Sequence, residues 1–131
     1  MKSHIVPTLP RPSGYSHATE VAGPGRIIYT SGMLGVDSAG NVIGKGDIRA
    51  QTEKTFENLK AALAAAGAGF EHVVKMNTYV VDVKHVPIIR EVRARYLNAS
   101  TPPASTLVGV AALASPDLLI EVEVIAVLPE R

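Results

Sequence analysis

Toward the C-terminal end of the chain, two glutamates alternate with apolar residues inside an otherwise aliphatic run, between residues 119 and 127. Such alternation is typical of a β-strand with two unlike faces. One face collects the apolar side chains Ile120, Val122, Val124 and Ala126. The other face carries Leu119, Glu121, Glu123 and Ile125. Two carboxylates among aliphatic neighbours are seldom a simple solvated edge, so we expect something polar to bind at that face.

Other apolar stretches predict further strands. Residues 102–110 form a second β-branched run, and a turn at residues 115–117 separates it from the run at 119–127, a pattern that predicts a hairpin. Upstream, residues 26–31 predict a short strand that ends at Gly32. The turn-forming residues 37–41 then lead to another short strand near Val42. Residues 72–82 predict a long strand.

Two segments have helical periodicity instead. The first begins after Asp47, the predicted N-cap, and ends at Gly67, a predicted left-handed C-terminal residue. Its apolar stripe consists of Ile48, Thr52, Phe56, Leu59, Ala62, Leu63 and Ala66. The second helix has Pro87 in its first turn and extends to about Leu97. Its inward stripe consists of Ile88, Ile89, Val92 and Tyr96.

The order of elements predicts an α+β fold, an α/β sandwich in which two helices cover one face of a five- or six-stranded sheet. The other sheet face, with Leu119, Ile125 and alternate residues of the strand at 72–82, then has no cover. Exposing several aliphatic side chains together is unfavourable for a monomer, by about 25 cal/mol per Å². We therefore expect the chain to associate with copies of itself through that face.

Composition narrows the function classes. The 131 residues fit one domain (1–131), preceded by a proline-containing extended arm at residues 1–14 in which Pro7, Pro10 and Pro12 disfavour regular hydrogen bonding. A net charge of +1 argues against a nucleic-acid partner. No apolar stretch approaches the ~20 residues that span a membrane. Without cysteine, disulfides and thiolate chemistry are excluded, and we expect a cytoplasmic protein.

Five segments, taken in chain order, resemble the RidA (YjgF-type) reactive-intermediate deaminase family. They are residues 14–18 (family pattern P-Y-S-x-A), 29–33 (F-x-S-G-Q), 51–67 (Q-T, N-L and A-G at matching spacing), 73–82 (V-V-K with a later D), and 103–126 (P-A-x-S/T-x-V-x-V, then V/I-E-x-E-x-I-A). The resemblance covers about residues 12 to 128. It implies a chorismate-mutase-like RidA fold with a six-stranded mixed sheet, and a homotrimer that binds small molecules in three clefts between subunits.

The resemblance also implies roles for several residues. Glu121 matches the glutamate that positions or activates the water attacking an imine carbon, a role for which partial desolvation of the carboxylate is suited. Tyr15, Ser31 and Gly32 match residues that line the cleft. Taken without the resemblance, Glu121 is more simply a structural glutamate and Gly32 a turn residue with positive φ. We expect Glu123, on the same face, to be structural.

One position departs from the family pattern. Where deaminating members carry an arginine that clamps the substrate carboxylate, this chain has Ser105. A serine hydroxyl offers a single donor and no charge. Two interpretations remain for Ser105 and Thr106: together they hydrogen-bond a neutral group of the ligand, or they are ordinary strand residues.

A replacement cation is a further hypothesis. Arg90 and Arg93 fall where many relatives have the pattern N-x-x-Y, and a guanidinium from that helix restores anion binding. The alternative is a solvated helix face, which is the commoner fate of arginines spaced i, i+3.

The leading functional hypothesis is hydrolysis of an enamine or imine metabolite to a carbonyl compound and ammonia. Its rival is a metabolite-binding or regulatory module that keeps the fold without the chemistry. Ribonuclease activity, which has been attached to relatives, has little support from the near-neutral charge. No cofactor is expected. The four histidines lack metal-ligand spacing, so no metal is expected either.

Overall fold

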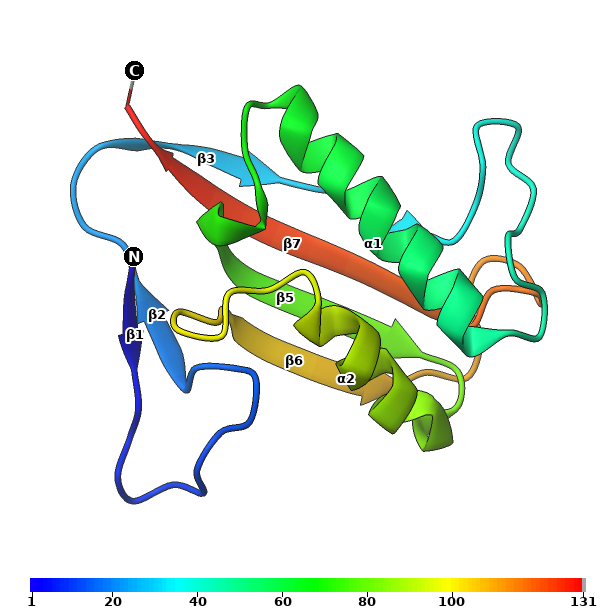
Figure 1. The fold of residues 1–131 in the computed structure, drawn as a ribbon, viewed down its shortest axis with the longest axis horizontal. Helices are drawn as coiled ribbons and strands as arrows, with labels where there is room; N and C mark the ends of the chain where they lie inside the picture. The colour runs from blue at the N-terminus through cyan, green and yellow to red at the C-terminus, as the bar shows by residue number, and fades with distance from the viewer. Residues whose placement is uncertain (131) are drawn as a thin grey trace.

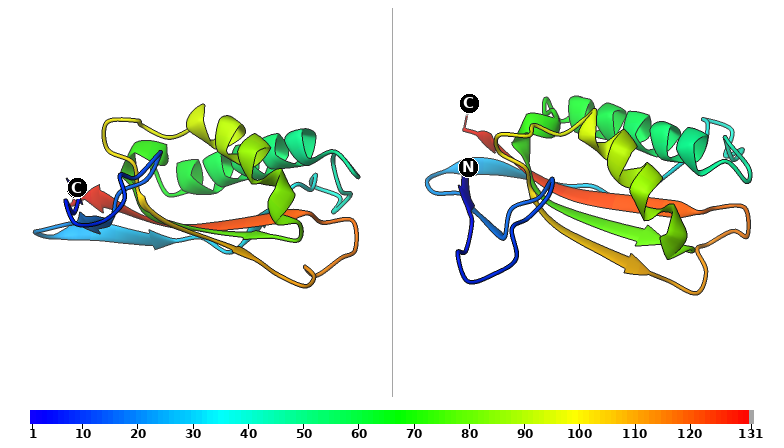
Figure 2. Two further views of the ribbon diagram at one scale, coloured as in Figure 1. Left: turned by 90° about the horizontal axis from the view of Figure 1, so that it is seen from below. Right: turned by 60° about the horizontal axis from the view of Figure 1, so that its bottom comes forward.

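The computed structural model describes residues 1–130, in which two helices pack on one face of a mixed β-sheet (Figure 1). The helices are α1 (Ile48–Ala65) and α2 (Val86–Ala94). The sheet has the order β3 (Gly25–Tyr29), β7 (Ile120–Pro129), β5 (Val73–Val80) and β6 (Ala104–Gly109), and β4 (Met33–Leu34) also pairs with β7. Figure 2 shows both helices on the same side of the sheet. The predicted α+β class is confirmed, although this sheet has five strands instead of six.

The predicted hairpin between the last two strands is wrong. β5 lies between β6 and β7, parallel to β6 and antiparallel to β7. α2 provides the crossover that a parallel β5–β6 pair requires. The segment from residue 110 to 119 is then long enough to carry the chain past β5, so the turn signal at 115–117 marks a crossing loop.

The N-terminal segment contains a short strand, which its prolines made difficult to predict. β1 (Lys2–His4) pairs antiparallel with β2 (Ala18–Glu20), ahead of the first proline at position 7. The expectation that residues 1–14 lack regular hydrogen bonding is therefore wrong for the first few residues. The loop between the two strands is held by His17, whose Nδ1 accepts from the Val6 amide at 2.8 Å. The predicted strand near Val42 is a single bridge between Val36 and Val42.

α1 begins and ends where the sequence predicts. The Asp47 side chain accepts from the Ala50 amide at 3.1 Å, and Gly67 follows the helix with φ +78°. These contacts satisfy amide and carbonyl groups that a helix end leaves free. The buried face of the helix consists of Ile48, Gln51, Thr52, Thr55, Phe56, Leu59 and Leu63.

α2 is shorter than predicted and is tied to α1 by aromatic side chains. It follows the 3₁₀ turn η2 (Val83–His85) and ends at Ala94, not near Leu97. Beyond its end, Tyr96 stacks on Phe56 with ring centroids 5.1 Å apart and contacts Phe70 at 5.4 Å. Phe70 belongs to η1 (Phe70–His72), which leads into β5. This cluster fixes α2 over the edge strand β6.

The two unlike faces predicted for the last strand are present in β7. Its helix-side residues are buried, and those on the other face are half-buried or exposed. The open face also carries two exposed side chains of β3, Ile27 and Tyr29, at 58% and 71% of their full exposure. Leu119, expected on this face, lies before β7 and packs against the core. Within residues 1–130, no helix is long and apolar enough to cross a membrane.

Candidate functional site

Glu121 lies half-buried on the open face of the sheet, near the start of β7. It is paired across the sheet with Tyr79 on one side and Leu34 on the other. Among residues 1–130, the Glu121 carboxylate has neither a hydrogen-bond donor nor a cationic partner. This carboxylate is therefore available to a water molecule or a ligand.

The neighbouring carboxylate on the same face is used differently. Glu123 accepts a hydrogen bond from the Tyr79 hydroxyl at 2.5 Å and another from the Asn77 amide at 3.5 Å. The bond to Glu123, followed by desolvation, raises the pKa of Tyr79 above its ordinary value. Glu123 is thus held within the sheet, in agreement with the structural role expected for it.

A β-bulge brings Ser31 and Gly32 to Glu121. Tyr29 is paired with Ile125 and Met33 with Val122, so the outer strand carries one more residue than β7 across this step. Thr30 holds the bulge, because its hydroxyl accepts from the Val124 amide at 3.0 Å. A Cβ on Gly32 would lie 2.6 Å from Glu121 Cδ, so only glycine fits there without displacing the carboxylate.

Glycine is required at position 32 because Glu121 approaches so closely, and not because of the backbone conformation. It is not among the glycines with positive φ, so the positive-φ turn considered for it from the sequence is wrong. Ser31 is exposed at the tip of the same bulge. The structure therefore brings Gly32 against Glu121, with the exposed Ser31 next to Gly32 in the chain.

Tyr15 and Ser105 belong to a second group of residues, between α2 and the edge strand β6. They line a pocket of about 350 Å³ together with Arg90, Arg93, Val83, Val86 and Leu107. Ser105 is paired with Met76, whose side chain is fully buried beneath the helices, so Ser105 lies on the helix side of the sheet. Tyr15 reaches β6 because Ser16 binds the carbonyls of Pro102 and Pro103 at 2.6 and 3.1 Å.

Ser105 and Thr106 do not act together within one protomer. Thr106 is paired with Asn77 on the open face and accepts a hydrogen bond from Lys75 Nζ at 2.8 Å. Consecutive strand residues face opposite sides, which separates the two hydroxyls. The hypothesis that this pair holds one neutral ligand group is wrong for a single chain.

Arg93 is the residue whose environment sequence reasoning misjudged. Its side chain is buried, at 7% exposure, whereas Arg90 one turn earlier is exposed. The solvated-face interpretation is right for Arg90 and wrong for Arg93. Desolvation, and then the charge of Arg90, lower the pKa of Arg93. The sequence spacing indicates this burial. Arg93 follows Ile89 by four residues and precedes Tyr96 by three, which places it on the core-facing side of the helix.

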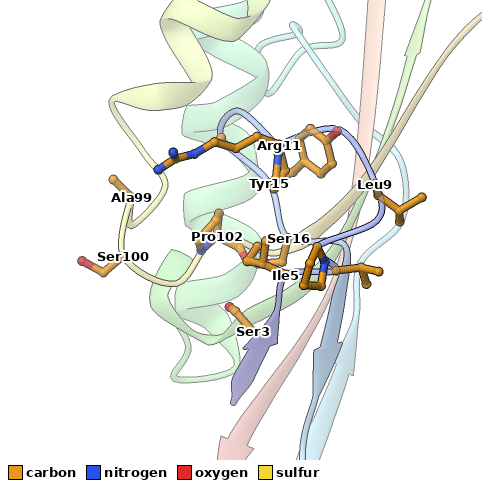
Figure 3. Close-up of a pocket in the computed structure, with 13 residues that line it drawn as sticks. Ser3, Ile5, Leu9, Arg11, Tyr15, Ser16, Ala99, Ser100 and Pro102 are labelled. Carbon is orange, nitrogen blue, oxygen red and sulfur yellow. The ribbon is translucent and has the colours of Figure 1, made fainter.

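A concavity of about 600 Å³ lies beside this pocket and is lined largely by the N-terminal segment. Figure 3 shows Arg11 and Tyr15 from that segment, with Ala99, Ser100 and Pro102 of the loop that precedes β6. Tyr15 lines both this concavity and the pocket under α2. Within residues 1–130, no cluster of three or more histidine, aspartate or glutamate side chains is arranged to hold a metal.

These features define a small α+β protein with one open sheet face, and comparisons assign its family. A profile of the family described as Endoribonuclease L-PSP matches residues 8–128. A RutC family protein of Pyrococcus abyssi is 40% identical over 118 residues, 89% of each chain. The crystal structure of the Rid family protein YyfB from Yersinia pestis superposes with a TM-score of 0.85 at 36% identity, covering 97% of this chain and 98% of that one.

A third relative carries an activity in its name. The chain is 35% identical over 123 residues to a 2-iminobutanoate/2-iminopropanoate deaminase of Dermatophagoides farinae, covering 93% of this chain and 92% of that protein. With these matches, the chain belongs to the RidA (YjgF-type) family, and the resemblance found in the sequence is confirmed.

Proposed function

We propose that this protein hydrolyses small imine or enamine metabolites, releasing ammonia and a carbonyl compound. An enamine first tautomerises to the imine; water then adds to the imine carbon, and the C–N bond of the resulting carbinolamine breaks. Glu121 accepts a proton from the attacking water, and the proton is passed to the departing nitrogen. The relative named for 2-iminobutanoate and 2-iminopropanoate supports this substrate class.

The observation that carries the proposal is the contrast between Glu121 and Glu123. Both carboxylates lie on the same face of β7. Glu123 is bound by Tyr79 and Asn77, whereas Glu121 has no partner among residues 1–130. Gly32 leaves room at this carboxylate, and Ser31 precedes Gly32 in the chain. A carboxylate that the fold leaves without a partner, next to a glycine that only just clears it, is suited to proton transfer.

We propose further that the working unit is a homotrimer with clefts between subunits. The exposed Ile27, Tyr29 and Val108 on the open face provide apolar surface for association, and Tyr15, Ser105 and Arg90 then bind the substrate from the neighbouring chain. Sedimentation tests the trimer directly. A monomer at micromolar concentration would contradict this part of the proposal.

The experiment generates 2-aminoacrylate in the presence of the pure protein and measures ammonia release above the buffer rate. Glu121→Gln keeps the shape of the side chain and removes the base, so we expect a loss of about 100-fold or more. The matched control is Glu123→Gln, whose amide oxygen still accepts from Tyr79; its rate should stay within about threefold of wild type.

A rate equal to buffer, unchanged by Glu121→Gln, would contradict the enzymatic proposal. The rival function is then a metabolite-binding module. It is suggested by Ser105, which stands where the family has an arginine. A metabolite-binding module should show a higher Tm with imino- or oxo-acid ligands and no turnover, because a ligand that binds only the folded state stabilises that state.

A further inference from the structure

Arg93 is a buried cation without a counter-ion. Its side chain projects from α2 into the layer between helix and sheet, where the residue keeps 7% of its exposure. Within residues 1–130, its guanidinium has no hydrogen-bond acceptor and no carboxylate within salt-bridge distance. The guanidinium borders two pockets and is not sealed from solvent. A ligand that enters these pockets can therefore reach its charge.

Neighbouring arginines show that this helix region does offer carboxylates. Arg95 donates to Glu53 at 2.8 Å, and Arg49 donates to Glu91 at 3.0 Å. Both pairs lie on the solvent side, where they link the two helices. Arg93 faces the other way, away from every one of these acidic groups.

The space that Arg93 faces is open and contains positive charge. Arg90 and Arg93 together line the pocket of about 350 Å³ and a second pocket of about 150 Å³. The lining of both pockets, as described, includes neither aspartate nor glutamate. A small anion is the ligand that such a lining favours.

Gly14 shapes the wall of this space. Its φ of +73° carries the chain around Arg93, and a Cβ at this position would come within 3.1 Å of Arg93 Nη2. Ser105 lines the 350 Å³ pocket together with Arg90 and Arg93. A ligand in that pocket meets guanidinium groups and a neutral hydroxyl.

We infer that Arg93 binds the carboxylate of the ligand, with Arg90 at the mouth, and so replaces the arginine missing at Ser105. This inference rests on the proposed function for the rest of the ligand, and it names the class: small 2-imino and 2-oxo acids. A planar guanidinium makes two parallel hydrogen bonds to a carboxylate, which a serine hydroxyl cannot provide. The clamp has moved from the edge strand to the helix above it.

Calorimetry with 2-oxobutanoate, a stable oxo acid, tests the inference without any turnover, and uncharged 2-butanone is the matched ligand. Arg93→Gln should weaken 2-oxobutanoate binding by roughly 10- to 100-fold. Arg95→Gln, an equal loss of charge on the solvent side of the same segment, should change it by no more than about twofold. Binding of 2-butanone should be weak and the same in all three proteins.

A double variant tests whether the two positions serve the same anion. Ser105→Arg introduced into Arg93→Gln should recover most of the lost affinity, because both side chains enter the same pocket. Circular dichroism checks each variant for folding. If Arg93→Gln does not fold, Arg93→Lys keeps the charge without the paired hydrogen bonds and should bind several-fold more weakly than wild type.

The inference and the proposed function fail separately. Equal 2-oxobutanoate affinity in wild type and Arg93→Gln, or no measurable binding to wild type, would overturn the role of Arg93. Arg93-dependent binding in a protein that releases no ammonia would leave the anion site in place and refute the deaminase. If the protein releases ammonia and Arg93→Gln leaves that rate unchanged, the deaminase proposal stands and the role of Arg93 is refuted.

Discussion

The two groups of site residues lie on opposite faces of one sheet. Glu121, Ser31 and Gly32 form an acidic region on the open face, and Arg93, Arg90, Tyr15 and Ser105 form a basic region beneath α2. Strand pairing fixes this separation, because Glu121 shares its face with Tyr79 and Ser105 shares the other with Met76. Within one chain, the acid and the anion site cannot reach the same small molecule.

The two regions also differ in how far their own chain already buries them. Arg93 is already desolvated by its own chain, so the basic region is preorganised. Glu121 is half-buried on a face that still exposes Ile27 and Tyr29, so its surroundings change when another surface covers that face. In the proposed site between two copies of the chain, one protomer would supply the carboxylate and its neighbour the arginine.

Mixing two inactive variants tests this comparison and has the largest expected effect. Glu121→Gln and Arg93→Gln each lose activity at low substrate concentration, by the arguments above. If each cleft takes its acid and its clamp from different chains, about a quarter of the clefts in a random one-to-one mixture of protomers regain both residues. Co-refolded mixtures should therefore recover close to a quarter of the wild-type ammonia release.

The control for this experiment is each variant co-refolded with itself, which should remain inactive. Sedimentation shows whether the mixed oligomers have formed. Mixed oligomers without recovered activity would mean that acid and clamp come from the same chain, and the comparison between the two regions would then be wrong.

Gly32→Ala is expected to have a smaller effect, confined to the acidic region. The new Cβ displaces the Glu121 carboxylate, which is the free end of a flexible side chain, so the fold should lose little stability. Activity should fall by roughly 10- to 100-fold, because a small misplacement of a catalytic group is enough for such a loss. Ammonia release and thermal melting together check this.

Binding of 2-oxobutanoate separates the two regions in the same variant. The basic region is remote from Gly32, so Gly32→Ala should keep the wild-type affinity for the oxo acid. A parallel loss of affinity and activity would show that the two regions are not independent.

The sequence predicted the acidic region better than the basic one. Glu121 and Gly32 meet through neighbouring strands, and the alternation in residues 119–127 already assigns Glu121 to the face opposite the core. No sequence pattern predicts the bulge at residues 30–32. The contact between Gly32 and the carboxylate is therefore visible only in the pairing of β3 and β4 with β7.

The basic region depended on a topology that the sequence did not reveal. Ser105 lies beneath α2 because β6 is parallel to β5, whereas a hairpin with β7 would have given β6 different neighbours. Arg93 was interpreted from its charge and not from its spacing, and Tyr15 reaches β6 only through the long-range contacts of Ser16 with residues 102 and 103. Contacts between distant segments set this region, and single-sequence patterns do not report them.

Alkaline titration compares a tyrosine that packs the helix bearing Arg93 with one beside Glu121, and it has the smallest expected effect. For Tyr96, which follows α2, burial and then the hydrogen bond to Glu57 at 2.8 Å raise the pKa from 10.0 to about 12. The unfolded chain ionises first, so this contribution to stability is present below pH 10 and is lost as the pH rises toward 12. Tyr96→Phe should therefore be less stable than wild type at pH 8, by about 1 kcal/mol, with the difference shrinking above pH 10.

Tyr79→Phe is the counterpart in the acidic region, where the bond to Glu123 is the largest cause of the raised pKa. Urea unfolding at pH 8, 10 and 11.5 measures both variants against wild type. The Tyr79 difference should shrink over the same pH range, because its phenol also ionises more readily in the unfolded chain. Tyr96→Phe should in addition loosen α2 on α1 and weaken 2-oxobutanoate binding slightly, whereas Tyr79→Phe should leave that affinity unchanged. A Tyr96 difference that stays constant from pH 8 to 11.5 would mean that this hydroxyl does not stabilise the helix that carries Arg93.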